Sequence, residues 1–317
     1  MFIRPLSNAM FPVSAAQKPC NHPPVDRLAE TRRVFLEGAH VVERWNGRAS
    51  FVVLDTHFDL GLHLLATWSA WRADPHRPQQ LHYLAMAGCP RAAPELCRLQ
   101  TAWPELSPLL QNLVAMWPQP LPGFHRLLLE DEGVVLTLIF GELEKCLPQV
   151  DAQVDTFYLH RTGIDRYLES GTLFTVLGRM AAPHAMLAMP KIQAGFEAGL
   201  PAAKDSGFVF EEGPFGAHAH FAPRWKPRSG QLRHHSEDER HVIVIGAGIA
   251  GSAACERLAA RGWRITLIER HAEAAREASG NLAGIFMPQL ARDDNPGVRL
   301  SRAAFLFALH LWQRMGG

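Results

Sequence analysis

Apolar runs alternate with amphipathic stretches between residues 50 and 190. Short runs rich in β-branched and aromatic residues, typical of buried strands, occur at 51–54, 81–86, 134–140, 154–159 and 185–189. Stretches with apolar residues at helical spacing lie at 62–71, 94–99 and 173–180. Strands that alternate with helices favour a parallel sheet covered on both faces. We therefore predict an α/β domain for this part of the chain.

Three other stretches lack this periodicity. Residues 1–26 contain several prolines and are predicted to be irregular, and prolines from 104 to 122 interrupt a helical region. Residues 222–240 are polar and contain prolines, as is typical of a linker. The sequence thus predicts a first domain over 27–221, a linker, and a second unit over 241–317.

The strongest local pattern spans residues 241–269. Four β-branched residues, 242–245, run into Gly246, Ala247, Gly248, Ile249, Ala250 and Gly251. A helical stretch follows, then a second apolar strand at 263–268 that ends at Glu269. A strand, a glycine turn, a helix, a strand and an acid within about thirty residues are typical of a dinucleotide-binding unit.

Each part of this pattern has a predicted role. Gly246 makes the tight turn, Gly248 lets a pyrophosphate approach the backbone, and Gly251 lets the helix pack closely on the strand. Free N–H groups at the start of the helix would face the phosphates. Glu269, which is followed by Arg270, would accept hydrogen bonds from a ribose.

The stretch after Glu269 offers further candidates. Ser279, Gly280 and Asn281 form a predicted turn whose small polar groups suit phosphate or ribitol hydroxyls. Residues 284–288 either lie against a flat ring system or form a surface turn followed by a buried strand. Residues 301–314 are predicted to be an amphipathic helix, whose Phe305, Leu309 and Trp312 belong to a core or an interface.

Composition narrows the class of protein. The 317 residues are 47% hydrophobic and 20% charged, with a net charge of +1, which is typical of a soluble protein without a global attraction to nucleic acid or membrane. There is no apolar run of about 18 residues, and the N-terminus does not resemble a signal peptide, so we expect a cytoplasmic protein.

Cysteines and histidines do not predict a metal site. The five cysteines form no C-x-x-C pair and are expected to be reduced thiols. The histidine pairs His218 with His220 and His234 with His235 have no cysteine or carboxylate at ligand spacing. Basic residues of the linker, from Arg224 to Arg240, are better explained as solvated charge than as an RNA contact, about two to one.

Two segments carry a resemblance to a known family. GAGIAGSAACERLAARGWRITLIER at 246–270 and EASGNLAGIFMPQLARDDNP at 277–296 resemble the start of the glycine-oxidase-like (D-amino-acid oxidase) flavoproteins. Over most of 28–317 the chain resembles the bifunctional enzymes of 5-methylaminomethyl-2-thiouridine biosynthesis in tRNA. The supporting stretches of the first domain are 28–38, 64–71, 102–110, 122–127 and 136–142.

This resemblance implies a Rossmann-like methyltransferase domain that uses S-adenosyl-L-methionine, followed by the βαβ start of an FAD-binding Rossmann domain. In that family the flavin domain removes the carboxymethyl group from a wobble-uridine side chain of tRNA by oxidising its amine. The methyltransferase domain then methylates the aminomethyl group. The resemblance assigns FAD to residues 246–251, 269–270 and 279–281, and S-adenosylmethionine to Asp55, Gly61 and Glu142; it assigns no catalytic residue.

The first domain departs from the family at its cofactor motifs. The family's loop E-x-G-F-G-x-G-L-N-F-L corresponds to DTHFDLGLHLL at 55–65, where only the third glycine, Gly61, remains. His57 and Asp59 add bulk where the backbone should approach the cofactor. The motifs at 86–88, 160–163 and 213–218 are altered as well. We therefore expect methyl transfer to be weak or absent.

The flavin part is expected to be incomplete, because the family's flavin domain continues well beyond the segment matched here. Three hypotheses follow. The chain is a bifunctional tRNA-modifying enzyme, or it is a non-catalytic remnant or fragment of one that acts as a binding module. The third hypothesis is a stand-alone FAD or NAD oxidoreductase.

Overall fold

The computed structural model describes residues 24–58, 60–88, 93–96, 103–160, 164, 167–168, 171–191, 196–224 and 240–316. Several sequence predictions lie outside these residues. They are the irregular segment up to residue 23, Asp59, the altered motif at 161–163, three cysteines (Cys20, Cys89 and Cys97), and the linker from 225 to 239 with His234 and His235.

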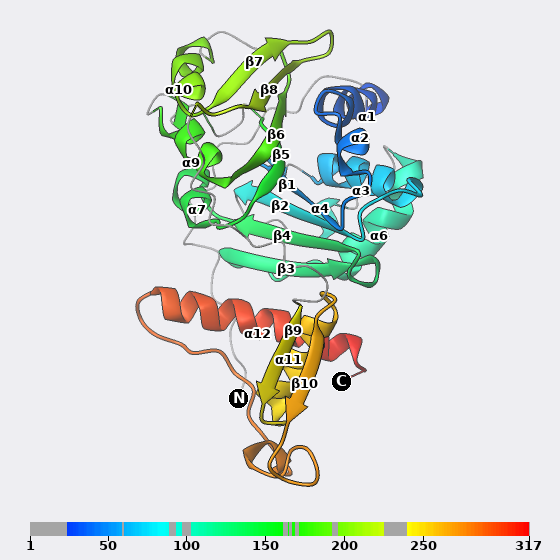
Figure 1. The fold of residues 1–317 in the computed structure, drawn as a ribbon, viewed down its shortest axis with the longest axis vertical. Coiled ribbons are helices and arrows are strands. Elements are labelled where there is room, and N and C mark those ends of the chain that lie inside the picture. Colours follow the sequence, from blue (N-terminus) through cyan, green and yellow to red (C-terminus); the bar gives the residue numbers. More distant parts are fainter. Residues whose placement is uncertain are drawn as a thin grey trace.

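An eight-stranded sheet is the centre of the first domain (Figure 1). Its strands are β1 (Ser50–Asp55), β2 (Gln80–Gly88), β3 (Gly123–Leu129), β4 (Val134–Phe140), β5 (Val154–Tyr158), β6 (Ala181–Met189), β7 (Phe208–Glu212) and β8 (Ala217–Phe221). The spatial order is β3-β4-β2-β1-β5-β6-β8-β7. This sheet confirms the predicted α/β class, and the five predicted strands coincide with β1, β2, β4, β5 and β6.

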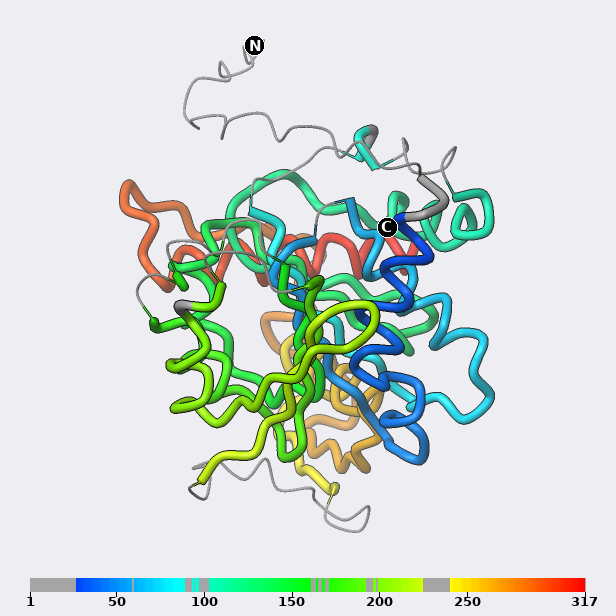
Figure 2. Tube along the Cα trace, turned by 90° about the horizontal axis from the view of Figure 1, so that it is seen from above, coloured from blue at the N-terminus to red at the C-terminus, as the bar shows by residue number. Residues whose placement is uncertain are grey.

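Helices cover both faces of this sheet (Figure 2). They are α1 (Pro24–Thr31), a π-helix (Arg32–Glu37), α2 (Val41–Trp45), α3 (Leu62–Ala73), α4 (Ala93–Leu96), α6 (Ser107–Ala115), α7 (Leu143–Cys146), α9 (Thr172–Met180) and α10 (Leu200–Asp205). Successive side chains of a strand point to opposite faces. Phe51 and Val53 of β1 accordingly pack with residues of α1, α2, α3, α4 and α6, whereas Leu54 packs with the core under α9 and α10.

The sheet is mixed, which corrects the expectation of a purely parallel one. Strands β4, β2, β1, β5 and β6 are parallel, but β3 pairs antiparallel with β4, and β8 is antiparallel to both β6 and β7. Antiparallel edge strands are common on otherwise parallel sheets. The sequence 217–221, AHAHF, carries a clear period of two, because its Ala and Phe side chains are buried and its histidines are half-buried.

The second unit has the predicted strand–helix–strand order. Strands β9 (His241–Ile245) and β10 (Arg264–Ile268) are parallel and form a separate sheet, with α11 (Ile249–Ala259) between them in sequence. A short 3₁₀ turn (Ala278–Gly280) and the long helix α12 (Pro296–Arg314) follow. Helix α12 lies along the outer strand β3 of the first domain (Figure 1).

One of the two alternatives for residues 284–288 is wrong. These residues form no buried strand, since they have no strand partner and the side chain of Ile285 is 89% exposed. Trp312 is 57% exposed, so of its two predicted roles the core is excluded and the interface stays a prediction. Phe305 does make an apolar contact, because its ring stacks on that of Phe286 at 4.7 Å. In the part of the chain that the structure describes, no helix has the length and apolarity to cross a membrane.

His82 gives the fold a pH dependence. Its imidazole, in β2, is largely removed from water, and Arg126 and Arg261 lie nearby; burial first, then these charges, lower the pKa of His82 to about 4. Between pH 4 and the usual value near 6.5, the unfolded chain binds more protons at this residue than the folded chain does. Stability therefore falls as the pH is lowered through this window.

We predict that His82→Gln reduces the loss of stability between pH 7 and pH 4.5, measured by urea unfolding at several pH values. His76→Gln is the matched control, because the side chain of His76 is 73% exposed. An identical pH profile for the His82→Gln variant and the unaltered chain would contradict this assignment.

Candidate functional sites

The backbone between β9 and α11 requires glycine at two positions. Gly246 has a φ of +100°, in the left-handed region, and its amide donates to the carbonyl oxygen of Ile268 at 2.8 Å. A Cβ atom on Gly251 would lie 1.9 Å from the carbonyl oxygen of Gly246. The first turn of α11 therefore packs directly on the glycine turn, and no larger residue fits there.

Two acceptors lie on the amides of this turn. The Glu269 carboxylate accepts hydrogen bonds from the amides of Ala247 at 2.7 Å and His271 at 3.0 Å, and these bonds lower the pKa of Glu269. The Ser279 hydroxyl accepts one from the amide of Ile249, at 3.0 Å. The structure thus brings Glu269 and Ser279 to the start of α11, where free amides attract anions.

The other residues predicted for this site have contacts outside the amides of the glycine turn. The Arg270 guanidinium pairs with the carboxylate of Glu277, which also lies 2.7 Å from the imidazole of His271. Gly280 lies in the 3₁₀ turn, where a Cβ would meet the carbonyl oxygen of Ala275 at 2.2 Å. Ala250 continues the first turn of α11, and Asn281 is exposed directly after the 3₁₀ turn.

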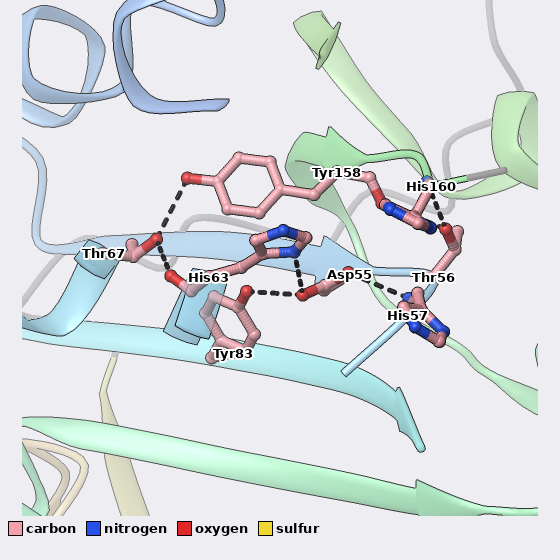
Figure 3. A network of polar contacts seen from close by, with 8 residues as sticks. All are labelled: Asp55, Thr56, His57, His63, Thr67, Tyr83, Tyr158 and His160. Atoms are coloured by element: carbon pink, nitrogen blue, oxygen red, sulfur yellow. Dashed lines mark hydrogen bonds and ion pairs between the residues drawn. The ribbon is translucent and has the colours of Figure 1, made fainter. Parts of the chain in front are cut away.

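The first domain has a second candidate site, at the carboxyl ends of β1 and β5. The order of the parallel strands reverses between these two strands, and ligands of open α/β sheets bind outside such a switch point. His57 follows β1 and His160 follows β5. Their rings stack at this point, with centroids 4.8 Å apart and planes inclined by 21° (Figure 3).

Asp55, the last residue of β1, is fully buried and has three partners (Figure 3). One carboxylate oxygen accepts a hydrogen bond from the amide of His57 at 2.9 Å. The other accepts one from the Tyr83 hydroxyl at 2.9 Å and lies 3.1 Å from Nδ1 of His63. Burial and the neighbouring carboxylate raise the pKa of Tyr83 well above its usual value, so its hydroxyl remains a donor.

Further polar contacts hold this network in place. Thr67 donates to the carbonyl oxygen of His63 at 2.8 Å, and its hydroxyl lies 3.1 Å from that of Tyr158. The amide of Thr56 donates to the carbonyl oxygen of Tyr158 at 3.0 Å, and the amide of His160 donates to the Thr56 hydroxyl at 3.0 Å. The two strand ends and helix α3 are therefore joined into one rigid arrangement.

Sequence reasoning found Asp55 but missed Tyr83, Tyr158 and His63. His63 could have been suspected, because it replaces the asparagine of the family's loop. The two tyrosines lie within strands, and only the register of the sheet, which pairs Val53 with Tyr83 and Asp55 with Tyr158, brings them to this end.

Gly61 packs against a buried ring in the loop after β1, whereas Glu142 lies at the surface after β4. Gly61 has a φ of +89°, and a Cβ atom would lie 2.8 Å from the ring of the buried Phe58. Glu142 follows β4 after Gly141; its side chain is 69% exposed and pairs with Lys145 at 2.8 Å. The assignment of Asp55, Gly61 and Glu142 to S-adenosylmethionine stays a prediction.

Two surface hollows and one histidine cluster are formed by residues other than those of the two candidate sites. Surface hollows of about 320 Å³ and 300 Å³ are lined by residues of the N-terminal helices and α3, and by Arg33 and Phe215 with their neighbours. His218 and His220 face Glu211 of β7 at 3.5 and 3.8 Å. Among the described residues there is no group of three or more side chains that could hold a metal ion.

Two parts of the chain match known protein families. Residues 241–317 match the model of the FAD dependent oxidoreductase family, and residues 104–161 match that of an S-adenosyl-L-methionine-dependent methyltransferase family. The tRNA 5-methylaminomethyl-2-thiouridine biosynthesis bifunctional protein MnmC of Paraburkholderia phytofirmans is 42% identical over 93% of this chain and 47% of its own length. Nearly the whole length of this chain is therefore similar to a part of MnmC.

A second MnmC protein, from Thiobacillus denitrificans, is also 42% identical, over 96% of this chain and 49% of its own. The chain thus spans about half the length of the curated relatives it matches. Among solved structures, MnmC2 of Aquifex aeolicus covers 64% of each chain with a TM-score of 0.46 and 13% identity. The match to the methyltransferase family lies in the first domain and the match to the FAD dependent oxidoreductase family covers the second unit.

We predict that Tyr83→Phe destabilises the first domain by about 1–3 kcal/mol, because a buried carboxylate loses a hydrogen-bond donor. Tyr158→Phe is the matched comparison: it removes a buried hydroxyl whose partner, Thr67, keeps its bond to the carbonyl of His63. It should cost less, about 0.5–1.5 kcal/mol. Urea unfolding measures both, and equal losses would show that the hydrogen bond from Tyr83 to Asp55 stabilises the domain no more than the contact of Tyr158 with Thr67 does.

Proposed function

We propose that the chain is a tRNA wobble-uridine modification protein of the MnmC type, and that its second unit binds the adenosine diphosphate end of FAD. The observation that carries this proposal is the glycine turn, in which Gly246 reverses the backbone and Gly251 lets the first turn of α11 pack on it, while the amides of Ala247 and Ile249 bind the side-chain acceptors Glu269 and Ser279. The 42% identity to MnmC proteins and the match of 241–317 to FAD dependent oxidoreductases support it.

The residues around the turn fit this cofactor. Residues 246–251 would hold the pyrophosphate, and Glu269 with Arg270 would lie at the adenosine ribose. Residues 279–281 would meet phosphate or ribitol hydroxyls. The amide of Ile249, which now donates to the neutral Ser279 hydroxyl, would donate to a charged phosphate oxygen instead. When bound, FAD supplies two-electron oxidation of a C–N bond.

The described residues contribute only one end of such a site. Amine oxidation needs a cavity that excludes water, whereas the sheet of β9 and β10 exposes apolar side chains, with Ile245 at 83%. The substrate we propose is the 5-carboxymethylaminomethyl group of a tRNA wobble uridine, as the resemblance implies. A tRNA partner also implies a cytoplasmic location.

For the first domain we propose a second role, that of a binding module that keeps the methyltransferase fold. S-adenosylmethionine does not fit the switch point as it stands. The Asp55 carboxylate is buried and already has three partners, and the stacked rings of His57 and His160 lie where the loop backbone should be open.

Flavin binding can be tested on the intact chain by titration with FAD, following the flavin fluorescence. We expect saturable binding that ADP competes away, and its loss in Gly251→Ala, whose Cβ would collide with the carbonyl of Gly246. Gly284→Ala is the control, because a Cβ there meets nothing within 4 Å. Absence of binding by the unaltered chain, or equal binding by Gly251→Ala, would overturn the proposal.

Calorimetric titration with S-adenosylmethionine tests the second role. We expect a dissociation constant in the millimolar range or no measurable heat for the unaltered chain. His57→Gly removes one ring of the stack and restores a glycine of the family's loop, so its affinity should rise. His76→Gly, at an exposed position, should leave the affinity unchanged. Micromolar affinity of the unaltered chain would restore the methyltransferase hypothesis.

A further inference from the structure

The turn between β3 and β4 is made of three acidic residues in a left-handed conformation. Glu130 and Asp131 have a φ of +49°, and Glu132 has a φ of +74°. Residues other than glycine seldom adopt this conformation, and three in succession persist only where the surroundings hold them. The backbone strain of this turn therefore points to a role for one of its side chains.

Glu132 has a partner far away in the sequence. Its two carboxylate oxygens accept hydrogen bonds from both terminal nitrogens of Arg257, at 3.0 and 2.6 Å. The side chains of Arg257 and Glu132 are only 15% and 16% exposed. A bidentate pair of a guanidinium and a carboxylate fixes direction as well as distance, and it is stronger where water is largely excluded.

Arg257 also joins the elements of the second unit. It lies in the last turn of α11, where the neighbouring carboxylate of Glu256 binds it as well. Its guanidinium lies 6.0 Å from the ring centroid of Phe307 in α12. Helix α12 runs along β3, where Arg302 donates to the carbonyl oxygen of Pro122 at 3.4 Å. Arg257 thus contacts α11, α12 and the first domain.

We infer that the pair Glu132–Arg257 is an interdomain clamp that fixes the second unit, which begins at residue 241, on the outer edge of the first domain. Helix α11 begins at the glycine turn and carries Arg257 in its last turn, so the clamp holds the end opposite the proposed phosphate site. The carboxyl ends of β9 and β10, and with them the glycine turn, point away from the first domain (Figure 1). Glu132 is then a positioning residue for a site to which it does not belong.

The inference does not depend on flavin binding, and its test needs no cofactor. Hydrogen–deuterium exchange of the intact chain, followed by mass spectrometry, is compared for the unaltered protein, Glu132→Gln and Arg257→Met. We expect the amides of α12 and β3 to exchange about tenfold faster or more in both variants, because removal of one partner leaves the other charge partly buried. The amides of β1 and β5, in the centre of the sheet, should exchange as before.

Two further variants keep this test decisive. Asp131→Asn lies in the same left-handed turn and should leave the exchange of α12 and β3 unchanged. The charge reversal Glu132→Arg with Arg257→Glu should restore at least part of the protection that either single reversal removes. The clamp is refuted if Glu132→Gln and Arg257→Met leave α12 and β3 protected, or if exchange rises equally in β1 and β5, which would indicate general loss of the fold.

Discussion

The burial of one carboxylate determines what the first domain can do. Asp55 stands at the carboxyl end of the central strand, with no exposed surface, and a charge in such a place must be compensated by donors. Tyr83, His63 and the amide of His57 supply them. Each donor comes from a different segment, so the network ties the loop after β1 to β2 and α3. With three partners from the chain itself and no exposed surface, this carboxylate is held as part of the fold.

The glycine turn of the second unit shows the opposite situation. Its polar groups are backbone amides at a helix start, and their present acceptors are Glu269 and Ser279. Both acceptors are side chains near the surface, which can be exchanged for a phosphate at little cost in desolvation. The two sites share the same strand–turn–helix geometry, yet only the second keeps exchangeable contacts. This difference, rather than the fold, separates the proposed functions of the two parts.

Much of this arrangement could be predicted from the sequence. Apolar runs located β1, β2, β4, β5 and β6, and the spacing of Gly246, Gly248 and Gly251 located the turn, because local patterns suffice for both. The edge strand β3 was missed, since its buried positions include His125, whose Nε2–H donates to the carbonyl oxygen of Leu121. The partners of Asp55 were missed because they depend on the register between β1, β2 and β5, which no local pattern contains.

The pair Glu132–Arg257 joins the two units of the chain. No sequence pattern marks Glu132 as the partner of Arg257, 125 residues away, and an acidic turn is ordinarily explained as solvated charge. The left-handed backbone at three non-glycine residues is visible only in the structure. Strain of this kind has to be balanced by contacts elsewhere, and the bidentate pair with Arg257 provides them. Helix α12, whose Phe307 ring lies near the same guanidinium, packs along the edge strand β3, and a covered edge is less open to pairing with other chains.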